Sequence, residues 1–327
     1  MPKGTTIIDE TDRKLIILLN KNSRVSASSA AKMLRKSREF IDYRIRKLVR
    51  LGYFSSFTIT VSNKMLGFEA YQILLRLNNY TYEQQSALLS YLSASSNVKI
   101  LERCSGDWDV LAKVVFTDRY YLVNFLDRLN EKFSAIINNY EILMDHIPVK
   151  HEDLFFISPF RFLASFRKHS SERYIRDEVD KRMLAILAED SRISLKSLAM
   201  KAGISIDSGI SRFKKLVGKN VITSFKSLIN FEKFDVQFYY LFLRISKFSE
   251  EKRKKLEILF ENEHGVVYAG RVIGNWDLLI QVVARNQKEF DVQMERIRTH
   301  LTNEIKSYAF AIVIENISKV TYPKIMH

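Results

Sequence analysis

A basic segment near the start of the sequence has the residue types that bind phosphate groups. The stretch RKSREFIDYRIRKLVR, residues 35–50, holds seven basic side chains and two acidic ones. Lysine and arginine neutralise nucleic-acid phosphates, and arginine can also donate two hydrogen bonds to a guanine edge. The whole chain has a formal net charge of +15, which favours a polyanionic partner, nucleic acid first and an anionic membrane surface second. The segment is therefore a candidate DNA-binding surface.

Three predicted helices would position these side chains. Asp9 can cap the first helix, and Ser26 begins a short second helix. Ser37 can cap a third helix over about 38–51, where Gly52 is placed to end it. A short helix, a tight turn and a basic helix form the arrangement that lets a recognition helix enter the major groove of DNA.

The third helix has one apolar face and one basic face. Ile41, Ile45 and Leu48 recur at helical spacing and would pack on the first two helices. The opposite positions would contact bases and phosphates. The expected DNA-contacting residues of this copy are Ser37, Arg38, Asp42, Tyr43, Arg44, Arg46, Lys47 and Arg50. The alternative is a solvated basic helix; a membrane-surface helix is disfavoured because the domain core needs the apolar face.

The chain repeats itself after 168 residues. GDWDVLAKVV at 106–115 returns as GNWDLLIQVV at 274–283, and DETDRKLIILLNKNSRVS at 9–26 returns as DEVDKRMLAILAEDSRIS at 177–194. The register needs no gap, so the chain is a tandem duplication. A unit of this length can bury its own core, and we expect each half to be a folding unit of two subdomains.

The second copy of the basic helix is weaker than the first. GISIDSGISRFKKLVGK at 203–219 has a net charge of +3, against +5 for 35–50. Gly209 inside this helix is expected to cost roughly 1 kcal/mol relative to alanine. We therefore expect the first copy to make more of the DNA contacts. The expected contact residues of the second copy are Ser205, Ser208, Arg212, Lys214 and Lys215.

The rest of each half alternates between strands and helices. The expected elements of the first copy are a linking strand at 53–61, strands at 68–77, 98–104, 108–116 and 137–145, and helices at 81–95 and 118–133. The order βαββαβ is that of a ferredoxin-like sheet covered on one face by two helices. Gly106 and Gly274 would supply the positive φ of the turn before the third strand. The uncovered face of each sheet would pair with another such sheet, within the chain or between chains.

The predicted fold class is α+β, with two tandem copies of a winged-helix-like, three-helix helix-turn-helix domain followed by a ferredoxin-like domain. The expected limits are 1–62 and 63–147 for the first pair of domains, 148–176 for a connector, and 177–230 and 231–327 for the second pair. The connector mixes phenylalanines with basic residues and is not a Gly/Ser tether. It would pack as an ordered linker or add DNA backbone contacts through Arg167, Lys168, Arg173 and Arg176.

The sequence lacks the patterns of several other protein classes. Cys104 is the only cysteine, which excludes a disulfide framework and a cysteine-rich zinc site, and we expect it to be a core or strand residue. There is no phosphate-binding glycine loop, metal-ligand cluster or nucleophile elbow, so we expect no cofactor, metal or catalytic residue. No apolar run approaches the roughly 18 residues that span a bilayer, and the N-terminus lacks an export signal. These features predict a cytoplasmic protein.

Three markers recur in both halves of the chain: DETDRKLIILLNKNSRVS, YRIRKLVRLGYF and GDWDVLAKVV, with their counterparts. As a set, and over almost the whole chain apart from roughly 148–176, they resemble the Lrp/AsnC (feast/famine) family of transcription regulators. The resemblance implies operator binding by the third helix, dimerisation through the sheet domain, and an amino acid or similar effector bound near the turn after strand two. By position, the turn residues are Gly106, Asp107, Trp108, Asp109, Gly274, Asn275, Trp276 and Asp277.

The turn residues also have a structural interpretation, in which the tryptophans are core or interface aromatics and the aspartates at 109 and 277 only fix the turn. Two features depart from the family pattern. Members usually carry one copy per chain, so the tandem form corresponds to a covalent pseudo-dimer. Members also commonly have a glycine in the helix-turn-helix bend, where the first copy has LRKS and the second has AGIS.

An enzyme of the same architecture, the sirohaem decarboxylase, is the alternative function. Its chemistry would need histidine or arginine beside the sheet. His264, Arg103 and Arg271 lie near the second strands, but the first copy has Asn97 near the position of His264. The basic third helix would also have no purpose in such an enzyme. We therefore favour a sequence-specific DNA-binding transcription regulator that acts on double-stranded DNA as a homodimer or an intrachain pseudo-dimer, with no membrane partner.

Overall fold

Two compact units make up the computed structural model, which describes residues 8–150, 173–246, 248–301 and 304–319. The first unit combines Met1–Leu66 with Leu154–Asp235, and the second combines Gly67–Asp153 with Val236–His327. Each unit therefore takes one segment from each copy. The expectation that each half forms its own folding unit is wrong, because equivalent segments of the two copies pack on each other.

The first unit contains two three-helix bundles. Their helices are α1 (Glu10–Lys21), α2 (Ala27–Leu34) and α3 (Arg38–Arg50) in the first copy, and α7 (Glu178–Glu189), α8 (Leu195–Ala202) and α9 (Ile206–Gly218) in the second. The predicted helix starts at Asp9, Ser26 and Ser37 are confirmed, since each side chain caps its helix by accepting a hydrogen bond from the backbone N–H three residues later. The equivalent caps of the second copy are Asp177, Ser194 and Ser205.

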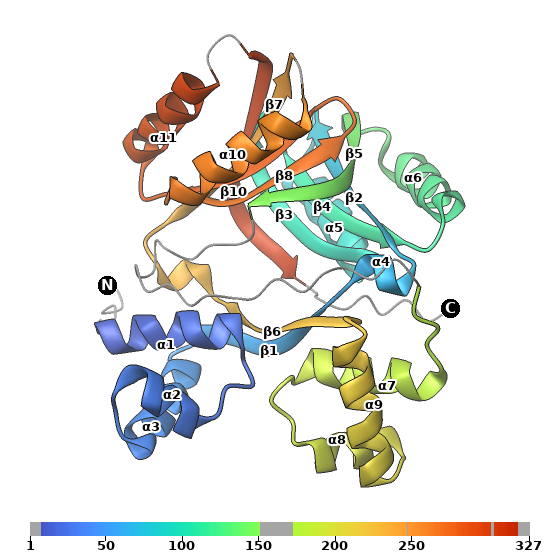
Figure 1. Ribbon diagram of the computed structural model, residues 1–327. Coiled ribbons are helices and arrows are strands. Elements are labelled where there is room, and N and C mark those ends of the chain that lie inside the picture. Colours follow the sequence, from blue (N-terminus) through green and yellow to red (C-terminus); the bar gives the residue numbers. More distant parts are fainter. Residues whose placement is uncertain (1–7, 151–172, 247, 302–303, 320–327) are drawn as a thin grey trace. The chain divides into compact units, whose positions relative to one another are not determined.

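A two-stranded antiparallel ribbon joins the two bundles. β1 (Phe54–Val61) pairs with β6 (Ile222–Ile229), and Ile59 lies opposite Phe225. One bundle lies toward each end of this ribbon (Figure 1). The linking strand predicted in the first copy thus pairs with its own counterpart in the second. The short helices that follow these strands are α4 (Asn63–Leu66) and η1 (Phe231–Lys233).

The second unit is a closed barrel with the strand order β10-β3-β4-β2-β5-β8-β9-β7. The strands are β2 (Glu69–Leu77), β3 (Val98–Gly106), β4 (Val110–Phe116), β5 (Ile137–Lys150), β7 (Gln237–Ile245), β8 (Val266–Ile273), β9 (Leu278–Ala284) and β10 (Ile305–Lys319). The helices are α5 (Tyr82–Ala94), α6 (Arg119–Phe133), α10 (Glu250–Asn262) and α11 (Gln287–His300). The predicted order βαββαβ is therefore confirmed in each copy.

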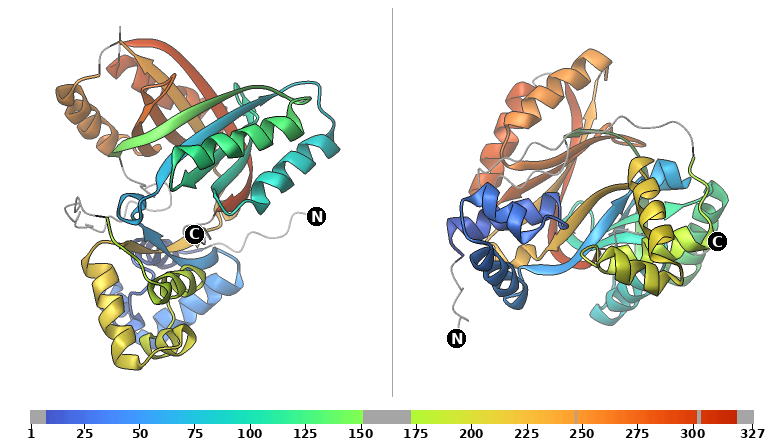
Figure 2. Two further views of the ribbon diagram at one scale, coloured as in Figure 1. Left: turned by 90° about the vertical axis from the view of Figure 1, so that its right-hand side faces the viewer. Right: turned by 60° about the horizontal axis from the view of Figure 1, so that its bottom comes forward.

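The barrel closes because the last strand of each copy is long. The first part of β5 pairs with β2 of its own copy up to Met144, and the rest pairs with β8 of the other copy. β10 likewise pairs with both β7 and β3. Figure 2 shows these long strands passing from one sheet to the other. The sheets are thus joined edge to edge within one chain, and the described strands of the barrel have no free edge.

The described residues of the barrel include three apolar cores. Leu88 and Phe125 belong to the core between the first sheet and its helices, and Phe260 and Phe290 belong to the equivalent core of the second copy. The third core combines residues of both copies, and its members include Leu74, Cys104, Trp108, Phe242 and Leu279. The sheet faces that were expected to need a partner therefore pack on each other within the chain.

The single cysteine of the chain belongs to this shared core. Cys104 is buried on β3, and burial raises the pKa of its thiol, so it is a core residue as predicted. Among the described residues, we find no helix with the length and apolarity needed to cross a membrane.

Candidate nucleic-acid interface

Helix α3 presents one buried face and one exposed face. Ile41 and Leu48 are fully buried against the bundle, as predicted. On the opposite side Tyr43, Arg46 and Arg50 are exposed, and Tyr43 is 54% exposed. No ion pair joins Arg46 or Arg50 to another described residue. Their guanidinium groups are therefore available for an external anion.

The other predicted residues of this helix have different surroundings. The Ser37 hydroxyl accepts a hydrogen bond from the Phe40 backbone N–H at 3.2 Å. Arg38 and Asp42 lie 3.8 Å apart, with side chains that are 67% and 43% exposed. An exposed pair of this kind contributes little to stability, so a phosphate or base can displace it at small cost. Lys47 is half-buried at the side of the exposed face.

Arg44 does not lie on the exposed face. Its guanidinium group is 2.8 Å from the Asp9 carboxylate and 3.0 Å from the Asp12 carboxylate, and its side chain is only 18% exposed. Partial burial raises the pKa of Asp9, but the Asp12 backbone N–H and Arg44 outweigh it and lower this pKa below 3.8. Arg44 thus joins α3 to the first turn of α1, which fits a residue that positions the helix and not one that contacts DNA.

Arg212 in α9 makes the equivalent contacts. It lies 2.6 Å from the Asp177 carboxylate and 2.9 Å from the Asp180 carboxylate. These hydrogen bonds raise the pKa of Arg212 above its ordinary value. Asp180 is buried, as is its counterpart Asp12. In both copies, therefore, an arginine that was predicted to contact DNA joins the third helix to the first.

The helix-turn-helix bend has a left-handed residue in both copies. Gly203 has φ 72° and ψ 37°, and Arg35 at the equivalent position has φ 53° and ψ 50°. The first copy thus keeps the bend geometry without the glycine. A non-glycine residue in this conformation costs roughly 1–2 kcal/mol.

Gly209 has a packing role that the sequence prediction missed. A Cβ at this position would lie 2.6 Å from the Cβ of Ala199, so α8 and α9 can approach closely only with glycine here. The equivalent residue of α3 is the buried Ile41. The expected advantage of alanine over Gly209 is therefore corrected: the clash outweighs the helix propensity.

The exposed face of α9 has a different composition from that of α3. Ile206 is 42% exposed, and Ser211, Lys214 and Lys215 are also exposed. The ammonium group of Lys215 lies 5.4 Å from the centre of the Tyr174 ring. The two predicted serines lie at the start of the helix, where Ser205 caps the N–H of the half-buried Ser208.

The two bundles contact each other through a pseudo-twofold pair of turns. The hydroxyls of Ser23 and Ser191, which are 168 residues apart, lie 2.6 Å from each other. Arg24 donates to the carbonyls of Ser191 and Ile193, and Arg192 donates to the carbonyl of Ser23. Such reciprocal contacts are those of an isologous dimer interface. The repeated Ser-Arg pair in the sequence was the available signal for this interface, and it was not interpreted.

The described residues of the connector contact both neighbouring elements: Lys150 still pairs with β8, and the Tyr174 N–H donates to the Met65 carbonyl at 2.8 Å. Arg173 is exposed, and Arg176 donates to the backbone carbonyl of Leu66 at 3.5 Å. The predicted contacts of Arg167 and Lys168 lie outside the described residues.

The predicted effector turns are built alike in the two copies. Gly106 has φ 119° and Gly274 has φ 151°, as the predicted turn requires. The Asp109 carboxylate accepts a hydrogen bond from the Leu77 N–H at 2.7 Å, and Asp277 accepts one from the Ile245 N–H at 2.8 Å. Both aspartates thus fix the end of the neighbouring strand.

The second residue of each turn differs between the copies. The Asp107 carboxylate accepts a hydrogen bond from the Phe310 N–H at 2.9 Å and lies 3.7 Å from Arg76. The equivalent residue, Asn275, is exposed.

The two tryptophans of these turns have different partners. The Trp276 indole N–H donates to the Glu141 carboxylate at 2.7 Å. Trp108 is 5% exposed, and its indole nitrogen has no hydrogen-bond partner among the described residues. The residue equivalent to Glu141 is Ala309, which explains the missing acceptor. Both rings pack with the core shared by the two sheets, as their structural interpretation predicted.

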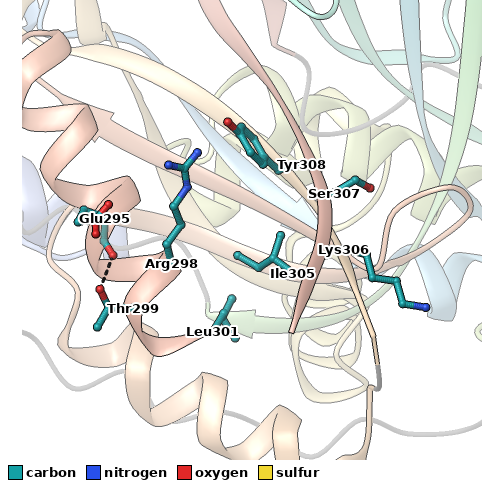
Figure 3. Close-up of a pocket in the computed structure, with 8 residues that line it drawn as sticks. All are labelled: Glu295, Arg298, Thr299, Leu301, Ile305, Lys306, Ser307 and Tyr308. Atoms are coloured by element: carbon teal, nitrogen blue, oxygen red, sulfur yellow. Dashed lines mark hydrogen bonds between the residues drawn. The ribbon is translucent and has the colours of Figure 1, made fainter. Parts of the chain in front are cut away.

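A surface pocket lies between the end of α11 and the start of β10 (Figure 3). Its lining residues are Glu295, Arg298, Thr299, Leu301, Ile305, Lys306, Ser307 and Tyr308. The Arg298 guanidinium lies over the Tyr308 ring, 4.7 Å from its centre. Sequence reasoning did not single out this pocket, and none of its residues belongs to the predicted effector turns.

The residues considered for an enzyme each have a different partner or surrounding. Arg103 pairs with Glu315 at 3.1 Å, and Arg271 lies over the Phe248 ring, 4.3 Å from its centre. His264 is exposed ahead of β8, and the Asn97 side chain donates to the Val115 carbonyl. Within the described residues, no group of three histidine, cysteine, aspartate or glutamate side chains is arranged to hold a metal ion.

Comparison with known proteins identifies the class of this chain. The model of the AsnC-type helix-turn-helix domain matches residues 177–217. The HTH-type transcriptional regulator FL11 of Pyrococcus furiosus is 30% identical over 123 residues, which cover 37% of this chain and 79% of that protein. An uncharacterized HTH-type transcriptional regulator of Pyrococcus horikoshii is 32% identical over 110 residues, which cover 33% of this chain and 73% of the relative. The chain therefore belongs to the Lrp/AsnC family of helix-turn-helix transcriptional regulators.

Solved structures of one enzyme are similar over nearly the whole chain. The siroheme decarboxylase NirDL has a TM-score of 0.66 at 13% identity and covers 96% of this chain and 94% of its own. At this identity the similarity shows a shared architecture of helix-turn-helix and ferredoxin-like domains.

Proposed function

We propose that this regulator binds an operator in double-stranded DNA through α3 and α9, with α3 as the principal recognition helix. The proposed contact residues are Ser37, Arg38, Asp42, Tyr43, Arg46, Lys47 and Arg50 in the first copy, and Ser205, Ser208, Lys214 and Lys215 in the second. Arg44 and Arg212 act as positioning residues, because their carboxylate partners hold each third helix on its bundle.

A single observation carries the proposal. Arg46 and Arg50 lie on the exposed side of α3, opposite its buried face, and neither is neutralised by a described carboxylate. A helix with this arrangement can enter a major groove without giving up its own packing. A merely solvated basic helix would more commonly pair its arginines with acidic neighbours, as Arg253 does with Glu250 and Glu257 in α10.

The experiment compares duplex binding by the wild type, by Arg46→Ala/Arg50→Ala and by a control that loses the same charge elsewhere. Lys254→Ala/Lys288→Ala is a suitable control because both lysines are exposed on helices of the barrel unit. Fluorescence anisotropy with mixed-sequence duplex DNA should show weaker binding for the α3 variant and wild-type binding for the control. Equal loss in both variants would mean that net charge, and not α3, determines binding.

We further propose that an amino acid or similar small effector binds near the turns that contain Trp108 and Trp276. The two tryptophans are the only ones in the chain, so their fluorescence reports on this region specifically. A titration with single amino acids should change the emission and shift DNA affinity with the same midpoint. An emission change without an effect on DNA binding would contradict an effector role.

We favour a regulator over an enzyme, because the exposed arginines of α3 serve the proposed DNA binding and His264 has no counterpart in the first copy. The reciprocal contacts of Ser23 with Ser191 and the shared core of the barrel support function as an intrachain pseudo-dimer. DNA as the partner is our reason for proposing that the protein acts in the cytoplasm. Absorbance titration with an iron tetrapyrrole tests the enzyme alternative, since saturable binding would favour it.

A further inference from the structure

The exposed faces of the two recognition helices differ at most of the positions that would meet DNA. At equivalent positions, α3 has Arg38, Tyr43, Arg46 and Arg50, and α9 has Ile206, Ser211, Lys214 and Gly218. All eight residues are exposed. The positioning arginines Arg44 and Arg212, by contrast, make similar contacts in the two copies. The two bundles are thus alike as scaffolds and different as reading surfaces.

These side chains have different chemistry toward base edges. Arginine can form a bidentate pair with guanine in the major groove, and α3 has three exposed arginines on this face. Lys214 acts as a point charge toward a phosphate, and Gly218 has no side chain. Ile206, at the first helical position of α9, can contact a thymine methyl group but cannot hydrogen-bond a base.

The two reading surfaces are also held together in a fixed order. In a symmetric dimer either subunit can take either half-site, and the operator is accordingly a palindrome. Here the β1–β6 ribbon and the reciprocal contacts of Arg24 and Arg192 join one copy of each kind. Every molecule therefore presents one α3 and one α9.

We propose, resting on the proposed operator binding, that this chain reads an asymmetric operator. One half-site, called the strong arm, is contacted by α3, contains guanine and carries most of the sequence information. The other arm, read by α9, is defined loosely, with thymine at the position of Ile206 and contacts mainly to phosphate. The covalent duplication would thus make the regulator bind its site in one orientation only, whereas a palindromic site permits both.

The test is in vitro selection from duplexes with a random region of about three helical turns, roughly 30 base pairs, so that two half-sites fit. The wild type should enrich a motif with one strong guanine-containing arm and one weak arm. A motif with two equal arms would overturn the asymmetric operator and leave the proposed function standing. Failure to enrich any duplex would overturn the proposed function and the asymmetric operator with it.

Matched variants assign each arm to its helix. Arg46→Ala should lower affinity for the selected duplex by roughly 10- to 100-fold and erase a guanine preference in the strong arm only. Lys214→Ala should weaken binding to all duplexes alike. The variant Ile206→Arg/Ser211→Tyr/Lys214→Arg/Gly218→Arg gives α9 the exposed residues of α3 and should select a motif with two strong arms. Because these positions are exposed, thermal unfolding should confirm that the variant folds, and an unchanged asymmetric motif would contradict the assignment.

Discussion

The two helix-turn-helix bundles have equivalent internal ion pairs but different exposed faces. Each has an acidic cap on its first helix and an arginine of its third helix bound to that cap, as in the contacts of Arg44 with Asp9 and of Arg212 with Asp177. The exposed positions differ, as Arg46 and Lys214 illustrate. A basic residue of the third helix can thus either bind a carboxylate within the bundle, as Arg44 does, or face solvent, as Arg46 does. The burial of the side chain distinguishes the two cases.

Removal of Arg44 should have the largest effect on stability. Arg44→Ala leaves the fully buried Asp12 carboxylate without its cation, and the expected loss is about 3 kcal/mol of unfolding free energy. Arg212→Ala should cost less, because the Arg212 side chain is 32% exposed and water can replace part of its contribution. Urea denaturation measures the loss of unfolding free energy in each variant, and equal losses would contradict the expected order.

The pH dependence of the unfolding free energy tests the same ion pairs independently. The pKa values of Asp9 and Asp177 are lowered in the folded state from an ordinary value of 3.8. A group with a lowered folded pKa contributes stability above its unfolded pKa and loses it as pH falls through the folded pKa. Unfolding free energy should therefore decrease from about pH 5 downward. Arg44→Ala should have a shallower decrease, and an unchanged slope would mean that the pair contributes nothing.

The barrel offers a second comparison, between the hydrogen bond of Glu141 and the ion pair of Glu315. Glu141→Ala removes the acceptor of the Trp276 indole N–H and should cost about 1–3 kcal/mol. Glu315→Ala is the control, since its partner Arg103 stays partly exposed to water, and it should cost less than about 1 kcal/mol. Thermal unfolding followed by tryptophan fluorescence distinguishes the two. A silent Glu141→Ala would show that water replaces the carboxylate.

Two glycines of α9 should respond in opposite directions to alanine. Gly209→Ala places a Cβ against that of Ala199 and should cost about 1–3 kcal/mol. Gly218 has open space around it, and Gly218→Ala should stabilise the helix by up to about 1 kcal/mol. Calorimetry of the two single variants decides whether close packing or helix propensity governs each position. Stabilisation by both substitutions would remove the packing role of Gly209.

The sequence predicted most local features but not their long-range partners. Asp9, Ser26 and Ser37 were identified as helix starts because a helix start depends on residues about three positions apart. The closed barrel was not predicted, because closure depends on pairing of Met144 with Ile273, far along the chain. The same limit explains Arg44, whose partners lie about 32 and 35 residues earlier and whose type equally fits a DNA contact.

The smallest expected effect concerns the helix-turn-helix bend. Arg35 has the left-handed conformation that Gly203 adopts without strain, and Arg35→Gly should stabilise the first bundle by up to about 1 kcal/mol. Gly203→Ala should destabilise the second bundle by a similar amount. Differential scanning calorimetry measures both changes. A loss of stability in Arg35→Gly would show that the arginine side chain makes contacts that compensate for its backbone strain.

The salt dependence of duplex binding tests the central claim, that the exposed arginines of α3 neutralise DNA phosphates or read bases while Arg44 holds the helix. The wild type should show log K falling steeply with log salt. Arg46→Ala/Arg50→Ala should lower the slope by about one unit for each phosphate contact removed, and Lys254→Ala/Lys288→Ala should leave it unchanged. A slope that is flat in the wild type, or identical in both double variants, would contradict the account.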